Sequence, residues 1–233
     1  MEYKIEGQNF PVLICTLDKD EAMITQSGGM AWMSPSIDMK TEGGGSIGGA
    51  FSRMFSGEAI FRNIYTSTKN DSMIAFTPSA PGQIIPVNIT QDKPLIVQKS
   101  SFFASTAGIT TKIYLNKKFR TGFFGGEGFI MQELSGNGTA FIEIFGSAIE
   151  YNLKSNESLL VDTGSIAFMD STCTMDIQTV KGIKNILFGG EGLFITSIKG
   201  PGRVALQTMQ ISEFAKLIIP FLPKSDGINK LNL

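Results

Sequence analysis

The sequence predicts an all-β protein built from three repeated units, and three observations support this prediction. Apolar residues make up 42% of the chain and charged residues 18%, a balance typical of a protein with a well-buried core. Short apolar runs rich in glycine and phenylalanine alternate with polar turns, which favours many short strands over long helices. A motif of roughly 65–70 residues also recurs along the chain. We expect a single domain over residues 1–233, with repeats at 11–84, 85–148 and 149–210 and a C-terminal helix and tail at 211–233.

Each repeat opens with a strand, a polar turn and a second strand. This pattern places residues 16–24, 88–96 and 152–160 over one another. The register continues without a gap through the next eight residues of each copy and aligns Trp32 with Ala104 and Phe168. Cys15 and Cys173 also fall at positions that are apolar in all three copies. Because such positions are core positions first, we expect Trp32 and both cysteines to be buried.

Farther along, each repeat reaches a turn in which glutamate follows glycine: Gly57 and Glu58, Gly126 and Glu127, Gly190 and Glu191. The structural interpretation is that each carboxylate accepts hydrogen bonds from backbone N–H groups of its own turn, which recurs because the fold recurs. The alternative is that a threefold arrangement brings the three glutamates together as oxygen ligands for a cation. No other type of ligand accompanies them, so the structural interpretation is favoured and no metal centre is predicted.

A β-hairpin is predicted after each of these turns. It is clearest where Phe129–Leu134 and Thr139–Phe145 flank Ser135-Gly136-Asn137-Gly138, since Asn and Gly accept the positive φ angles of tight turns. Three such units would bury their apolar faces against one another around a pseudo-threefold axis, and a linear array is the alternative. The chain ends differently. Ser212 and Glu213 predict the start of a helix, which Pro220 bends or stops.

Composition argues against several classes of function. Twenty basic and 21 acidic residues leave a formal net charge of −1, so no global field attracts nucleic-acid phosphates. The absence of histidine removes the commonest general base and the commonest zinc ligand. Cys15 and Cys173 lie far apart in the sequence, with no Cys-x-x-Cys spacing that would indicate a metal or redox pair. We therefore predict no catalytic residue, no metal and no cofactor.

The sequence shows no recognisable targeting signal. The first residues lack the basic and apolar regions of a secretory signal, and no stretch approaches the roughly 20 apolar residues that span a bilayer. A cytoplasmic protein is the default expectation, with peripheral membrane contact left open.

Copy one departs from the other two by a glycine-rich insertion over residues 41–49. No Gly-Lys-Ser/Thr follows it, so phosphate binding of the P-loop kind is disfavoured. Directly after the insertion, apolar side chains gather beside a cation at Phe51, Arg53, Met54 and Phe55. If exposed, these residues form an interaction patch for a partner or a membrane surface. The alternative is that they cover one end of the core.

The sequence resembles a known family, the one that includes the yeast mitochondrial protein altered inheritance of mitochondria 24. The resemblance spans nearly the whole chain. It is carried by Gly43-Gly44-Gly45, Arg53, Gly57-Glu58, Phe61 and Asn63 in copy one, and by residues 189–194 and 200–207 in copy three. It implies a β-roll or β-sandwich fold similar to that of the tryptophan RNA-binding attenuation protein, with internal pseudo-threefold symmetry. It implies no reaction.

The leading functional hypothesis is a non-enzymatic structural or assembly module that forms a homo-oligomer, since a β-roll of this size exposes edge strands that must be covered or paired. An unidentified protein partner is compatible with the same hypothesis. The alternative from another class is a small-ligand or RNA-binding module, by analogy with the attenuation-protein fold. An enzyme would have to work through carboxylates, lysines or a bound metal.

Overall fold

The computed structural model describes residues 1–25, 28–42, 62–114, 129–179 and 194–222. Over these residues the chain forms nineteen β-strands and one α-helix, so the predicted all-β class is confirmed. The opening strand is β1 (Glu2–Glu6), which pairs antiparallel with β2 (Val12–Leu17). In β2 buried side chains alternate with half-buried ones, because one face of the strand meets the core.

Three successive groups of six strands make up the rest of the sheet structure. The first unit contains β2, β3 (Ala22–Thr25), β4 (Met30–Met33), β5 (Ile37–Glu42), β6 (Arg62–Ser67) and β7 (Ser72–Phe76). The second contains β8 (Gly82–Ile89), β9 (Leu95–Gln98), β10 (Phe102–Thr106), β11 (Ile109–Ile113), β12 (Met131–Gly136) and β13 (Gly138–Phe145). The third contains β14 (Ala148–Leu153), β15 (Ser158–Asp162), β16 (Ile166–Asp170), β17 (Thr174–Thr179), β18 (Phe194–Lys199) and β19 (Gly202–Gln207).

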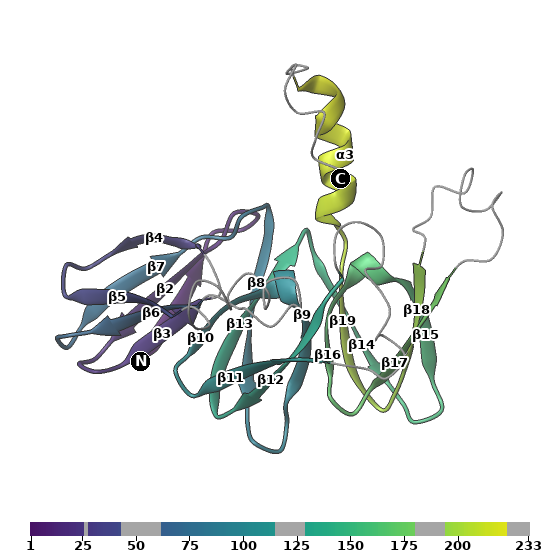
Figure 1. The fold of residues 1–233 in the computed structure, drawn as a ribbon, viewed down its shortest axis with the longest axis horizontal. Helices are drawn as coiled ribbons and strands as arrows, with labels where there is room; N and C mark the ends of the chain where they lie inside the picture. The colour runs from purple at the N-terminus through teal and green to yellow at the C-terminus, as the bar shows by residue number, and fades with distance from the viewer. Residues whose placement is uncertain (26–27, 43–61, 115–128, 180–193, 223–233) are drawn as a thin grey trace, which may run out of the picture.

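Strand pairing follows the same order in every unit. The first, sixth and third strands adjoin, as in β2-β7-β4, and the fourth, fifth and second strands adjoin, as in β5-β6-β3. These half-sheets join across the units to give four sheets in a row (Figure 1): β1-β2-β7-β4, β5-β6-β3-β10-β13-β8, β11-β12-β9-β16-β19-β14 and β15-β18-β17. Each of the two inner sheets is therefore completed by strands from two neighbouring units.

Neighbouring units are connected by one strand pairing each, here called a joint, and the two joints have the same register. At the first joint β3 pairs antiparallel with β10, and Thr25 lies opposite Ala104. At the second joint β9 pairs antiparallel with β16, and Val97 lies opposite Phe168. Each third strand also carries a register shift against its sixth strand, and this shift is found in β4, β10 and β16 alike. A bulge at this position is thus compatible with pairing on the other edge of the strand.

Three hydrophobic clusters fill the spaces between the sheets. One lies in the first unit, around Leu13, Tyr65 and Phe76, and the other two follow in the second and third units. Because successive side chains of a strand point to opposite faces, strands at a joint supply both neighbouring clusters. In β9, Val97 belongs to the middle cluster and Ile96 to the third one.

The predicted hairpin between 129–134 and 139–145 is wrong. β12 pairs with β11 and β9, whereas β13 pairs with β8 and β10, so the two strands lie in different sheets. Gly136 and Gly138 do adopt the expected positive φ, at 113° and 153°. The turn leads the chain from one sheet to the next. The prediction of the turn residues was therefore right, whereas the predicted pairing of the two strands with each other was wrong.

The predicted pseudo-threefold arrangement is not confirmed. β4 and β15 stand at opposite ends of the row in Figure 1, and they are not paired with each other in the described part of the chain. Trp32, expected in the core, is 47% exposed, because β4 has a strand on one edge only. The prediction for the cysteines is confirmed, since Cys15 and Cys173 are buried and unpaired with each other.

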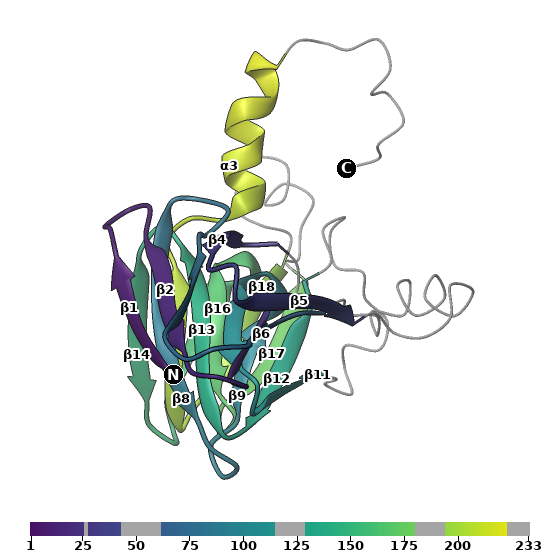
Figure 2. The same ribbon diagram turned by 90° about the vertical axis from the view of Figure 1, so that its left-hand side faces the viewer.

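The predicted C-terminal helix is present as α3 (Ile211–Ile218), continued by the 3-10 turn η4 (Ile219–Phe221), which contains Pro220. The residue before the first turn is Gln210, and it makes no side-chain capping bond, so the predicted cap at Ser212 is wrong. The helix projects from the sheets in both orientations (Figures 1 and 2). None of its residues is buried.

Candidate functional site

The site residues predicted from the sequence lie outside the described residues. Phe51, Arg53, Met54, Phe55 and the Gly57-Glu58 turn fall within residues 43–61, while the other two turns fall within 115–128 and 180–193. In each unit these segments link the fourth strand to the fifth, which pair antiparallel with each other. The glycine-rich stretch begins later than expected, because Thr41 and Glu42 still belong to β5. The Thr41 hydroxyl donates to Asn63 Oδ1 on β6 at 2.9 Å.

The base of the first of these segments contacts the second unit. Arg62, the first residue of β6, donates from Nη2 to the backbone oxygen of Thr111 on β11 at 3.4 Å. The guanidinium thus links β6 of the first unit to β11 of the second.

In the described part of the chain the fold buries one glutamate, Glu143, which is a candidate catalytic carboxyl group. Glu143 on β13 is 6% exposed, and its carboxylate accepts the backbone N–H of Ser79 at 2.9 Å. Burial raises the pKa of this carboxyl group, and the N–H groups of Ser79 and Ala80 oppose that shift. The carboxylate therefore orders the 77–81 connection between β7 and β8, a structural task.

The two thiols are poor nucleophiles in this fold. Burial raises the pKa of Cys15 to about 12 and also raises the pKa of Cys173, where the nearby charge of Asp170 adds to the effect. Because the thiolate is the reactive form, both groups are held in their inert state. Among the residues that the structure describes, no three Cys, Asp or Glu side chains gather as a metal site would require.

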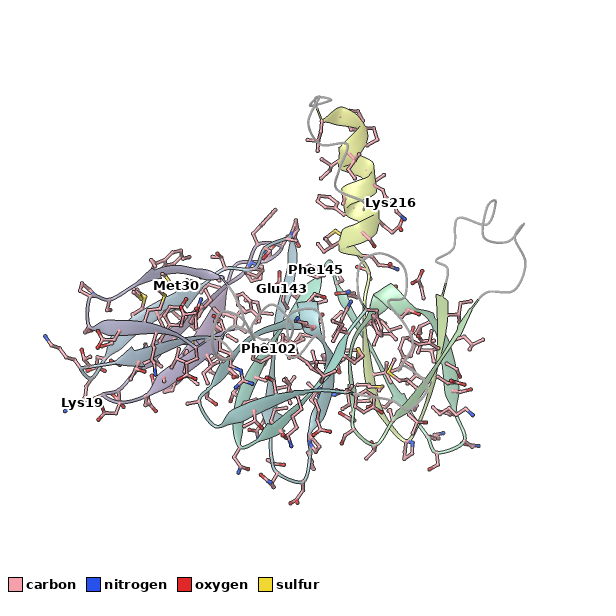
Figure 3. All side chains as sticks on the ribbon, in the orientation of Figure 1. Lys19, Met30, Phe102, Glu143, Phe145 and Lys216 are labelled. Atoms are coloured by element: carbon pink, nitrogen blue, oxygen red, sulfur yellow. The ribbon has the colours of Figure 1, made fainter. Side chains whose placement is uncertain are left out.

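The two outermost edges of the row carry exposed apolar residues. β4 pairs with β7 alone and β15 pairs with β18 alone, so each has one unpaired edge within the described sheets. Trp32 on β4 is 47% exposed and Leu160 on β15 is 67% exposed. Figure 3 labels Met30, on β4, at the end of the row away from β15.

Equivalent residues inside the row are buried. Ala104 and Phe168, which match Trp32 in strand position, are both 0% exposed. Ile96, which matches Leu160, is 1% exposed, and Ile24 at the same position in the first unit is partly buried. The difference is the presence or absence of a neighbouring strand. Sequence alignment of the repeats missed this, because it treats equivalent positions as equally buried.

A second exposed apolar surface lies on the projecting helix. It is formed by Ile211, Phe214, Leu217, Ile218, Ile219, Phe221 and Leu222. On the polar side Lys216 Nζ bonds to Glu213 Oε1 at 2.6 Å, and Figure 3 shows Lys216 on the helix well clear of the sheets. The helix is amphipathic, as its sequence predicts. Within the described residues, no helix is both long and apolar enough to cross a membrane.

Comparison with known proteins shows the family. The sequence model described as Mitochondrial biogenesis AIM24 matches residues 3–209. An uncharacterized protein of Streptococcus pyogenes serotype M6 is 24% identical over 235 residues, which cover 97% of this chain and 93% of that protein. A crystal structure of a Streptococcus pyogenes protein, a structural genomics target, superposes with a TM-score of 0.80 at 23% identity. It covers 95% of this chain and 99% of its own, and it shows that the fold is shared. The family match spans most of the 233 residues, which confirms the resemblance seen in the sequence, and the chain belongs to the AIM24 family.

Proposed function

We propose that this protein is a non-enzymatic assembly module that associates with copies of itself. The observation that carries the proposal is the sharing of sheets between units. Each inner sheet is completed by strands from two units, whereas in the described structure β4 and β15 lack the neighbour from another unit that β10, β16, β3 and β9 have. Exposed edges of this kind pair readily with another chain unless they are blocked.

The chemistry of the described residues supports the non-enzymatic part of the proposal. The buried Glu143 carboxylate is engaged by backbone N–H groups, and the buried thiols have raised pKa values. Asp170 accepts the backbone N–H of Arg203 at 2.8 Å and lies 3.7 Å from its guanidinium. Each of these groups has a structural role in the fold.

Size-exclusion chromatography with light scattering, run over a wide range of protein concentration, tests self-association. We expect a mass that is a multiple of the 25.2 kDa chain and that falls on dilution. A mass of one chain at every concentration contradicts the proposal. The alternative function, binding of RNA or a small ligand, would instead show as a shift in melting temperature with added ligand, and the formal net charge of −1 argues against RNA.

A further inference from the structure

We infer that β15 of one copy pairs antiparallel with β4 of a second copy, so that the third unit of one chain is followed by the first unit of the next. This inference rests on the proposed self-association and names the surfaces that carry it. It joins the three-stranded sheet β15-β18-β17 to the four-stranded sheet β1-β2-β7-β4. The partner is therefore a second copy of this chain.

The internal joints supply the template for this pairing. A second strand pairs with the third strand of the following unit in β3 with β10 and again in β9 with β16. Among the described strands, two of these types have no such partner, namely β15, a second strand, and β4, a third strand. The leftover strands are thus of the two types that already pair twice within the chain.

The register of the new joint follows from the internal ones. Thr25 lies opposite Ala104 at the first joint, and Val97 lies opposite Phe168 at the second. The residues equivalent to these are Val161 on β15 and Trp32 on β4. The same register places Leu160 opposite Met33.

The faces of the two strands match this register. In the internal joints, Ala104 packs into the cluster of the unit before it, and so does Phe168. Trp32 has no preceding unit in the described structure, and in the joint it packs beside Val161, which belongs to the third cluster. In the same way Ile96 packs into the cluster of the unit after it, and Leu160 has no such unit among the described residues. Opposite Leu160, Met33 already packs against the first cluster.

Both edges lack proline and carry little charge, and proline and charge are two of the features that prevent edge pairing in other proteins. β4 reads Met-Ala-Trp-Met, without a charge or a proline, and β15 has one charge, at its last residue Asp162. The Asp162 carboxylate is engaged locally, because its Oδ1 accepts the backbone N–H of Gly164 at 3.0 Å. The register shift in β4 is no obstacle, since β10 and β16 carry the same shift and still pair.

The contact is heterologous, because the surface on one copy differs from the surface on the other. Such contacts continue from copy to copy and either close into a ring or grow into a filament. A variant that blocks β15 on one chain leaves β4 of that chain available, and mixtures of variants can exploit this asymmetry.

Surface substitution tests the inference. Leu160→Lys places a charge on the edge, and we expect the dissociation constant to rise roughly 100-fold, because a lysine ammonium would have to enter an apolar joint. Leu160 is 67% exposed in the single chain, so this variant should keep the fold, which circular dichroism checks. Phe10→Lys is the matched control at a residue that is 75% exposed and belongs to neither β4 nor β15, and Leu217→Lys tests the helix.

The fluorescence of Trp32 reports directly on the joint, since Trp32 is the sole tryptophan of the chain. We expect its fluorescence emission to move to shorter wavelength on assembly and to stay at the exposed value in Leu160→Lys. In a second test, Met33→Cys and Leu160→Cys chains are mixed and oxidised, alongside a Trp32→Cys and Val161→Cys mixture. Along an antiparallel ladder, residue pairs with closely spaced Cα atoms alternate with more widely spaced pairs, and the two mixtures test two successive pairs. One mixture should therefore form a disulfide-linked dimer that neither variant forms alone.

The outcomes separate the inference from the proposed function. A wild-type protein that is monomeric throughout overturns both. A wild-type oligomer that Leu160→Lys leaves intact overturns only the inference, and the same holds if Leu217→Lys alone disperses it. Disulfide dimers formed within a single variant would also overturn it, because they require like edges to meet. The inference is supported if Leu160→Lys fails to assemble and if a mixture of cysteine variants forms disulfide-linked heterodimers.

Discussion

Thr25 of β3 lies opposite Ala104 of β10 at the joint between the first two units, and its buried hydroxyl has no hydrogen-bond partner among the described residues. The equivalent residues of the other two units, Val97 and Val161, have a methyl group there. We expect Thr25→Val to raise the free energy of unfolding by about 1 kcal/mol, because an unsatisfied polar group is replaced by an apolar group of the same shape.

Thr196→Val is the matched control for this substitution. Its hydroxyl is also buried, but it bonds to the Thr163 hydroxyl at 2.9 Å, so its loss should destabilise the fold by about 1 kcal/mol. Both values come from urea unfolding at one protein concentration. A loss of stability in Thr25→Val would show that its hydroxyl is satisfied.

The buried Glu143 carboxyl predicts a dependence of stability on pH. Its pKa is raised in the fold by burial, so the stabilising contribution of the protonated form is present below the unfolded pKa and is lost as pH rises through the folded pKa. Glu143→Gln removes this titration and keeps an oxygen that can accept the Ser79 N–H. We expect the variant to gain stability relative to wild type as pH rises from about 4 to about 7, a window that begins near the ordinary pKa of glutamate. A difference that stays constant, or that shrinks with rising pH, contradicts the argument.

Arg203 has two acidic neighbours that differ in what they do for the fold. Asp170 accepts the backbone N–H of Arg203 at 2.8 Å, whereas Glu150 contacts only the guanidinium, at 3.9 Å. We expect Asp170→Ala to cost about 1–3 kcal/mol, because a backbone donor loses a charged acceptor. Glu150→Ala should cost about 0–1 kcal/mol, because partly exposed ion pairs contribute little. Thermal unfolding of both variants measures the difference, and equal losses would contradict this ranking.

The thiols should be unreactive until the protein unfolds. Burial raises the pKa of Cys15 to about 12 and also raises that of Cys173, so both thiols are less ionised at pH 8 than ordinary exposed thiols. We expect a thiol-specific reagent to label neither residue in the folded protein and both in denaturant. The Phe10→Cys variant is the positive control, because its added thiol lies at a position that is 75% exposed. Rapid labelling of the folded wild type would contradict the prediction.

Repeat alignment placed the first two strands of each unit and failed at positions where a strand lacks a neighbour. The strand, turn and strand pattern of residues 16–24, 88–96 and 152–160 agrees with the observed elements. The same alignment predicted burial for Trp32, which is half-exposed. Burial depends on the strand that lies alongside, and that strand comes from another unit. A local pattern carries no signal for it.

The predicted candidate site and the proposed one come from different kinds of observation. Phe51, Arg53, Met54 and Phe55 were chosen because copy one departs from the other copies there, and they lie outside the described residues. The edges of β4 and β15 emerge only when strand pairing is known.

By itself the sequence determined the all-β class, the positions of the strands and the resemblance to the family, because alternation of apolar residues and turn residues are local features. The tertiary structure alone decided that β12 and β13 enter different sheets and that Trp32 and Leu160 remain exposed. The physical reason is that strand pairing is non-local. A strand exposes the same donors and acceptors whichever neighbour it receives, so the choice between neighbours is made only when the whole chain packs.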